Sequence, residues 1–312
     1  MAVKKGFFFT LTAMVFLVLL FLYISLDYQT RLRDKAIVID SRVTTLDHFV
    51  DDLEKDIERG VYIASFRSLL AIQQYITSKG EFLYDTDDVI EEIIINGTIN
   101  GEYMSVMNDT QLSIWVERIR VEAVKTGIYF NYTLNDISIS HSDPWTLTIS
   151  LDVTEYIQDR NGLAYWSRNK RINTSLSIVG FEDPLYTVNT FGRVINTIEK
   201  SSITDFVGPN NDTTNLLYHL DNSLYIDSQS APSYLMRLKG DLNSSPYGIE
   251  SLVNLIELEA NDINTLNKSC IDYIYFSKES PEHYLIKNTY NWFRLDNESG
   301  HLARYEVEEL IE

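Results

Sequence analysis

The feature that most constrains this chain is an uncharged apolar run near its N-terminus. From Phe7 to Leu26 the sequence holds 20 residues without Asp, Glu, Lys or Arg. A helix rises about 1.5 Å per residue, so the run is about 30 Å long and matches the hydrocarbon layer of a bilayer. No small-residue cleavage motif follows it, because the chain passes directly into Asp27. The run predicts a single transmembrane helix over residues 7–26, after a basic leader over residues 1–6.

The charges on either side of the run do not by themselves set its orientation. Lys4 and Lys5 precede it, and Arg31, Arg33, Lys35 and Arg42 follow it closely. A count of these cations would keep the C-terminal body inside the cell, but long domains cross the membrane largely regardless of flanking charge. The orientation therefore has to be inferred from the body itself.

Glycosylation motifs in the body favour an exterior location. The chain has eight Asn-x-Ser/Thr motifs, whereas its Asn, Ser and Thr content predicts about 3.5 by chance. We therefore expect a cytoplasmic N-terminus and an extracytoplasmic, glycosylated body at the cell surface. The candidate acceptors are Asn96, Asn108, Asn131, Asn173, Asn211, Asn243, Asn267 and Asn297.

The residues at the start of the run resemble a known processing signal. Lys4-Lys5-Gly6, followed by Phe7 to Leu11, is similar to the class III signal of archaeal type IV pilin-like proteins. The resemblance implies that a prepilin peptidase cuts between Gly6 and Phe7 and that the apolar stretch stays on the mature protein. Leu11 stands at the fifth position after that cut, where bacterial major pilins carry Glu. The resemblance therefore implies a minor pilin-like subunit, with other pilin-like subunits as partners.

A heptad pattern follows the apolar run and predicts an amphipathic helical stalk over residues 27–80. Apolar residues recur in alternating steps of four and three, with charges between them. Gly60 interrupts the spacing, and a second helical stretch is expected to stop at Gly80. Two interpretations stay open, self-association of the stalk as a coiled coil or packing on the chain's own domain. The heptad positions are Leu32, Ala36, Ile39, Val43, Leu46, Val50, Leu53 and Ile57.

The stalk is followed by the pattern of an α+β head over residues 81–180. A helix is expected from Gln111 to Thr126, ended by Gly127. Strict alternation of apolar and polar residues then predicts antiparallel strands with one wet face, on which Asn131 and Asn173 fall. These strands are expected at 128–134, 145–154, 165–171 and 172–178.

Residues 181–312 are expected to form a β-rich C-terminal domain or an extension of the first sheet. The expected fold class is thus α+β, with a long transmembrane helix that continues into an amphipathic helix, an antiparallel β-sheet head and a β-rich C-terminal half. The strand candidates are Tyr234–Leu238, Ile249–Leu258, Ile271–Phe276 and Trp292–Leu295, and a short helix is expected at Leu302–Leu310.

Composition and motifs argue against several functional classes. The net charge of −19 disfavours nucleic acid as a partner, because phosphate needs clustered basic side chains. Cys270 is the single cysteine, which excludes an intramolecular disulfide, and we expect it to be buried. No metal-binding histidine spacing, Gly-x-Ser-x-Gly elbow or nucleotide-binding glycine motif occurs. We therefore expect no catalytic residue, no metal and no cofactor, and we interpret His141, with Asp143 and Trp145, as ordinary turn chemistry.

Two acidic clusters invite a calcium interpretation. Asp85, Asp87 and Asp88 stand close to Glu91 and Glu92 in the first cluster, and Asn210-Asn211-Asp212 forms the second. Neither matches the EF-hand loop with its glycine and distal glutamate. A helix cap by Asp85 or Asp87 accounts for the first cluster without a metal.

Three functional hypotheses follow. The leading one is a non-enzymatic, membrane-anchored surface protein that resembles a minor type IV pilin-like subunit, with a structural or adhesive role and membrane lipid as a partner. The second is a signal-anchored binding or sensing domain that does not assemble into filaments. The third is an extracytoplasmic hydrolase with an active site outside the known motifs, for which a pocket that gathers carboxylates or His141 would speak.

Overall fold

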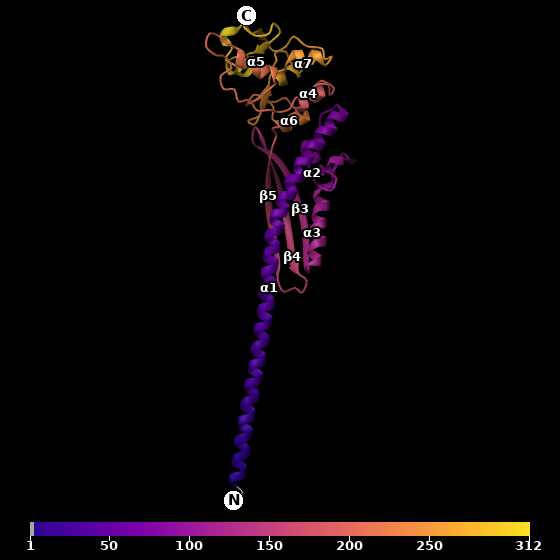
Figure 1. Ribbon diagram of the computed structural model, residues 1–312. Coiled ribbons are helices and arrows are strands. Elements are labelled where there is room, and N and C mark those ends of the chain that lie inside the picture. The colour runs from indigo at the N-terminus through magenta and orange to yellow at the C-terminus, as the bar shows by residue number, and fades with distance from the viewer. Residues whose placement is uncertain (1–2) are drawn as a thin grey trace. The chain divides into compact units, whose positions relative to one another are not determined.

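One long helix and a three-stranded sheet dominate the first half of the chain (Figure 1). The computed structural model describes residues 3–312, with side chains from Phe8 onward. The fold is α+β, with an apolar N-terminal helix, short helices and small antiparallel sheets. Its contacts divide the chain into two compact units. The first comprises Met1–Asp56, Ile119–Thr133 and Thr154–Asn169, and the second comprises Ile57–Arg118, Leu134–Val153 and Lys170–Glu312.

Helix α1 runs without a break from Val3 to Lys79, so the two predicted helical stretches are one helix. It ends as expected at Gly80, whose left-handed φ of 69° and N–H bond to the Ile76 carbonyl at 2.7 Å close the last turn. Gly60 stays helical, and a Cβ there would stand 2.9 Å from the ring of Trp115. Glycine at this position therefore makes room for the Trp115 ring and does not end the helix.

The N-terminal part of α1 is apolar and is not covered by the rest of the protein. Its most apolar 18-residue window has a mean hydropathy of 2.5, and none of that window is buried. Phe8, Phe16 and Leu20 expose 72%, 70% and 57% of their surface. Among the described residues, α1 is the one helix long and apolar enough to cross a membrane.

The heptad seam of α1 is divided into a covered and an uncovered part. Leu46, Val50 and Leu53 are buried, with exposed fractions of 1–4%. Leu32 and Val43, on the same seam, expose 48% and 36%. Packing of the stalk on the chain's own fold is thus confirmed for the later positions, while the earlier ones are left uncovered.

Within the first unit, α1 packs on segments of the sheet through apolar and charged contacts. The ring of Phe49 meets that of Phe130 edge to face, with centroids 6.4 Å apart. Arg168 on the sheet pairs with Glu54 of α1 and with the buried Glu155 of the neighbouring strand. Because Glu155 is buried, this arginine supplies the countercharge that its carboxylate needs.

The three-stranded sheet has the order β3-β4-β5 and consists of β3 (Ile128–Asp143), β4 (Thr146–Asp159) and β5 (Tyr165–Ser177). Burial alternates along β4 as predicted, with every second residue buried. The strands predicted at 165–171 and 172–178 are in fact one strand, because the alternation of sides continues across Arg171 and Ile172. Figure 1 shows the three strands side by side.

Other short elements link α1 to the sheet along the chain. The predicted helix at 111–126 is α3, whose bounds are Leu112–Lys125, with Gly127 just after it at φ 78°. The other elements are α2 (Thr86–Asn96), β1 (Thr98–Ile99), β2 (Glu102–Tyr103) and η1 (Ser105–Met107).

The C-terminal half is built mainly from short helices and loops, drawn orange to yellow in Figure 1. Its strands form two small antiparallel ladders, β6 with β7 and β8 with β9. Large buried aromatic side chains, including Tyr186, Tyr225, Phe293 and Tyr305, fill its core. The elements are α4 (Pro184–Asn189), α5 (Thr214–Asp221), β6 (Tyr225–Asp227), α6 (Tyr234–Lys239), β7 (Ile249–Ser251), α7 (Leu255–Ala260), α8 (Asp272–Tyr275), β8 (His283–Leu285), β9 (Arg294–Asp296), η2 (Glu298–Gly300), α9 (His301–Arg304) and η3 (Glu308–Leu310).

The expectation of a β-rich C-terminal half is therefore wrong in its details. Residues 234–238 and 271–276 are helical in α6 and α8, and 249–258 is strand only to Ser251 before α7 begins. A buried apolar run of five or six residues has no periodicity that separates strand from helix. The residues at the ends of these segments indicate helices. Gly240 ends α6 in the left-handed conformation, and the Asn254 side chain caps the start of α7.

The two remaining C-terminal predictions hold approximately. The strand expected at 292–295 is β9, shifted to Arg294–Asp296. The helix expected at 302–310 is split into α9 and the 3-10 turn η3.

Candidate functional site

The second unit buries a charged cluster around Arg237 of α6, the Arg237 network. Arg237 is fully buried and contacts the carboxylates of Asp183 and Asp272, the latter at 2.8 Å. The Tyr225 hydroxyl donates to Asp183 at 2.8 Å, and Ser251 donates to Asp272 through its hydroxyl at 2.9 Å. One guanidinium thus faces two carboxylates, and burial raises the pKa of Asp272 against the opposing effect of Arg237.

The Arg237 network holds secondary-structure elements together. Asp183 also caps α4, because its other carboxylate oxygen accepts the Leu185 N–H at 2.9 Å. Asp272 begins α8 and binds β7 through Ser251, while Arg237 donates to the carbonyl of Ile249 in β7. Every charge in the cluster has a buried partner, so the arrangement is a structural clamp.

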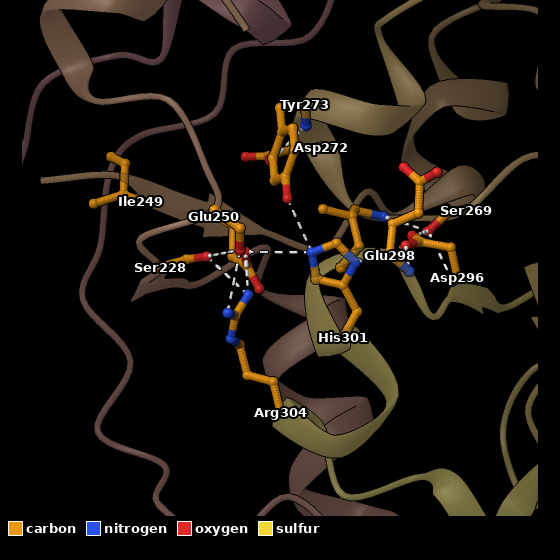
Figure 2. A network of polar contacts seen from close by, with 12 residues as sticks. Ser228, Ile249, Glu250, Ser269, Asp272, Tyr273, Asp296, Glu298, His301 and Arg304 are labelled. Atoms are coloured by element: carbon orange, nitrogen blue, oxygen red, sulfur yellow. Dashed lines mark hydrogen bonds and ion pairs between the residues drawn. The ribbon is translucent and has the colours of Figure 1, made fainter. Parts of the chain in front are cut away.

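A second buried cluster, the His301 network, surrounds His301 at the start of α9 (Figure 2). His301 Nδ1 lies 2.7 Å from Asp296 Oδ1, and Nε2 lies 3.0 Å from the hydroxyl of Tyr273 and 3.7 Å from Glu250 Oε2. Arg304 pairs with the same Glu250 oxygen at 2.8 Å. The network consists of Ser228, Ser230, Glu250, Ser269, Tyr273, Asp296, His301 and Arg304.

The chemistry of these groups assigns the protons. The Asp296 carboxylate only accepts, so Nδ1 of His301 carries a proton, and Nε2 on the other side of the ring faces the Tyr273 hydroxyl. Burial works to raise the pKa of Asp296, but the hydrogen bond from His301 and that from Ser269 bring it below its ordinary value. Burial raises the pKa of Tyr273, which therefore stays a phenol. The network consequently fixes the direction of the Tyr273 hydroxyl.

A cavity of about 530 Å³ lies beside the His301 network, and we call it the Tyr273 cavity. Tyr273 and Ser230 belong both to its wall and to the network. Ligand sites are typically 300–1,000 Å³ with few polar groups on apolar walls, so its size suits a small molecule. The wall residues are Phe82, Leu185, Asn189, Ser230, Gly240, Asp241, Leu242, Asn243, Tyr273, Ile274, Phe276, Ser277, Lys278, Glu279, Glu298 and Ser299.

The Asp-His-Ser combination of the network does not have the geometry of a nucleophilic triad. Ser269 is fully buried, and its hydroxyl donates to Asp296, the residue that orients the histidine. The histidine instead points to Tyr273, whose hydroxyl is a poor nucleophile at its raised pKa. The arrangement positions a wall of the cavity and does not activate a nucleophile.

The sequence-predicted glycan acceptors are all on the surface. The side chains of all eight asparagines are exposed, and Asn131 and Asn173 lie on the wet faces of β3 and β5 as expected. The processing residues predicted by resemblance, Lys4, Lys5, Gly6 and Phe7, have a helical backbone, and their side chains lie outside the described residues.

The acidic clusters act in local hydrogen bonds. Asp85 Oδ1 accepts the N–H groups of Asp87 and Asp88, which confirms the cap on α2. Asp212 Oδ1 accepts both the N–H and the hydroxyl of Thr214. In residues 8–312 no group of three or more His, Cys, Asp and Glu side chains is placed to hold a metal ion.

The other singled-out residues occupy unremarkable sites. His141 is half-buried, stacks on Tyr247 with centroids 5.8 Å apart, and its Nδ1 lies 3.3 Å from the carbonyl oxygen of Asp143. Cys270 is fully buried as expected, and burial raises the pKa of its thiol to about 12. Neither residue belongs to the Tyr273 cavity, although three carboxylates, Asp241, Glu279 and Glu298, do.

Sequence reasoning missed both buried networks. Arg237 and Asp272 each stand between apolar neighbours in short buried segments, which is a weak signal of paired buried charge. Partners in the networks, such as Glu250 and His301, lie far apart along the chain, so no local spacing connects them. Comparisons with known protein families, with curated proteins and with solved structures found no match.

Proposed function

We propose that this chain is a single-pass membrane-anchored protein with an extracytoplasmic body, resembling a minor pilin-like subunit. The observation that carries the proposal is the difference in burial between the two ends of helix α1. Residues such as Phe8 and Leu20 of α1 are bare, whereas Leu46 and Ile57 of the same helix are buried in the protein. Because each fully exposed large apolar side chain costs about 1.5–3 kcal/mol in water, the bare stretch needs a lipid or protein environment.

The length of the stretch favours lipid. Residues 8–26 carry no charge and span about 28 Å as a helix, close to the hydrocarbon thickness of a bilayer. The exposed positions of all eight glycan acceptors support an exterior body, because an acceptor must be reachable. The body then serves in contact or adhesion.

Self-association is a part of the same proposal. Leu32, Ala36, Ile39 and Val43 continue the heptad seam beyond its buried part and are exposed. A neighbouring helix of the same kind, in a pair or in a filament core, would cover them. Disulfide crosslinking tests this, because the native Cys270 is fully buried and should not react. The Ala36→Cys variant should form disulfide-linked dimers in membranes. The Asp34→Cys variant, whose cysteine lies off the seam, should form far fewer.

Mass spectrometry of the mature N-terminus tests the pilin-like part of the proposal. Processing predicts a chain that begins at Phe7, and an intact Met1–Gly6 segment contradicts it. Particle size after gentle detergent extraction then separates a filament subunit from the alternative, a signal-anchored binding domain that does not assemble. The Tyr273 cavity favours a binding role for the body in either case.

A further inference from the structure

The Tyr273 cavity has the size and construction of a small-molecule site that the anchor does not require. Its volume is about 530 Å³, and its wall draws on α4, α8, η2 and the loops after α6 and α8. Sites assembled from several elements hold their groups more precisely than a single surface loop does. The question is which ligand chemistry the wall would recognise.

Aromatic rings supply the apolar part of the wall. Phe276 packs edge to face on Tyr186 with ring centroids 5.1 Å apart, and this contact fixes the position of the Phe276 ring. Phe82 is seated against Gly240, where a Cβ would stand 2.7 Å from its ring. Gly240 also has φ 70°, so glycine is required there both by the backbone and by the ring. The third ring is that of Tyr273 itself.

Polar groups are interleaved with these rings, and the His301 network fixes two of them. The Tyr273 hydroxyl is bound to His301 at 3.0 Å, and Arg304 donates to the Ser230 hydroxyl at 3.2 Å. His301 and Arg304 are themselves held by buried carboxylates, those of Asp296 and Glu250. A ligand would therefore meet groups whose orientation is already set, which lowers the entropy cost of binding.

The remaining polar groups are of the kinds that bind hydroxyls. Asn189 contributes an amide, and Glu279 and Glu298 contribute carboxylates at the exposed side of the cavity. Each amide or carboxylate can take part in two hydrogen bonds with adjacent hydroxyl groups. Lys278 is the one cation on the wall, against three carboxylates when Asp241 is included, so the described wall disfavours an anion.

We propose that the Tyr273 cavity binds a neutral saccharide. A sugar ring presents apolar C–H faces to aromatic side chains and hydroxyl edges to amides and carboxylates, and the wall offers both. A simple amine would use the carboxylates and the rings as well, and spermidine is therefore included in the test below to distinguish it from a saccharide. The proposal does not rest on the membrane anchor, and it holds whether or not the protein assembles.

Calorimetric titration of the full chain in detergent micelles tests the proposal, with Asn243 unmodified. The probes are cellobiose, maltose and N,N′-diacetylchitobiose, with a sulfated disaccharide and spermidine as comparisons. At least one neutral disaccharide should bind with a Kd of about 1 mM or tighter, and the sulfated one should bind at least about tenfold more weakly. Absence of binding for all neutral probes, or binding of spermidine alone, overturns the proposal.

A pair of matched variants places the binding in the cavity. Asn189 and Asn222 both donate a side-chain hydrogen bond to the carbonyl four residues earlier at the end of a short helix, at 2.8 and 2.7 Å. Asn189→Trp fills the cavity and should weaken sugar binding about tenfold or more, whereas Asn222→Trp, on the exposed end of α5, should leave it unchanged. Glu298→Trp, at an exposed wall position, should weaken binding in the same way if Asn189→Trp does not fold. Equal affinity of the wild type and of the folded cavity variants contradicts the assignment.

Discussion

His301 Nδ1 lies 2.7 Å from Asp296 Oδ1, and both side chains are fully buried. The pair orients the ring, which in turn contacts the Tyr273 hydroxyl on its far side at 3.0 Å. A contact between β9 and α9 thus fixes a residue of α8 that lines a cavity. Stability and the shape of the candidate site therefore depend on the same hydrogen bonds.

Asp296→Asn should destabilise the protein by about 2–4 kcal/mol at pH 7, because the amide cannot accept from both Ser269 and His301 as the carboxylate does. The folded state lowers the pKa of Asp296, so its contribution is present above the unfolded pKa of about 4 and is lost as pH falls through the lower folded value. Denaturant unfolding of the full chain in detergent, followed by tryptophan fluorescence, measures both effects. Glu308→Gln, on the surface, is the control, and a fully stable Asp296→Asn variant contradicts the role of the pair.

His219→Phe should remove a loss of stability that the wild type shows in mild acid. His219 is fully buried in α5, and burial lowers its pKa to about 4, so the folded protein keeps it neutral while the unfolded chain protonates near pH 6.5. The wild type should therefore lose up to about 3 kcal/mol as pH falls from about 6.5 to about 4. Phenylalanine keeps the ring contacts with Phe206 and Tyr305 but cannot be protonated. Unfolding free energies from pH 4 to 8 check this, and equal slopes for the two proteins would contradict it.

Arg237→Met should destabilise the protein by about 3–5 kcal/mol, because it leaves Asp183 and Asp272 buried without their countercharge. Arg171→Met provides the contrast, since Arg171 pairs with Asp152 on the exposed face of the sheet and should cause no resolvable change. Thermal unfolding of both variants measures the difference. Similar melting temperatures for the two would show that the Arg237 network is not the clamp described above.

Leu46→Ala and Leu32→Ala form a matched pair on the heptad seam, since the two leucines stand 14 residues apart at the same heptad position. Leu46 exposes 1% and Leu32 exposes 48%. The first variant should lose about 2–5 kcal/mol of stability, and the second should keep the stability of the dissociated protein. If Leu32 is covered in an assembly, its variant should instead reduce crosslinking at position 36. Loss of monomer stability in Leu32→Ala contradicts the division of the seam.

Long periodic elements could be predicted from the sequence, and short buried ones could not. Helix α1 and its stop at Gly80 follow from composition and a terminal glycine, and the strands around Asn131 and Asn173 follow from strict alternation. The run 234–238 is too short to show a period and has Arg237 among its apolar residues, so its helical state could not be predicted from the pattern.

The candidate site could not be predicted for a related reason. Glu250 and His301 meet through the fold, and each looks ordinary in its own segment. The cavity wall likewise combines Phe82 with residues some two hundred positions later in the chain. Only the coordinates bring these groups together, because long-range pairing of charges leaves no local spacing in a single sequence.

Labelling with a membrane-impermeant maleimide on intact cells tests the central claim, an anchored body outside the cytoplasm, most directly. Ser280→Cys adds an exposed thiol to the C-terminal half, while the buried Cys270 stays unreactive. The account predicts labelling of the variant before lysis and retention of the labelled chain in carbonate-washed membranes. Labelling only after lysis, or release of the chain into the soluble fraction, would contradict it.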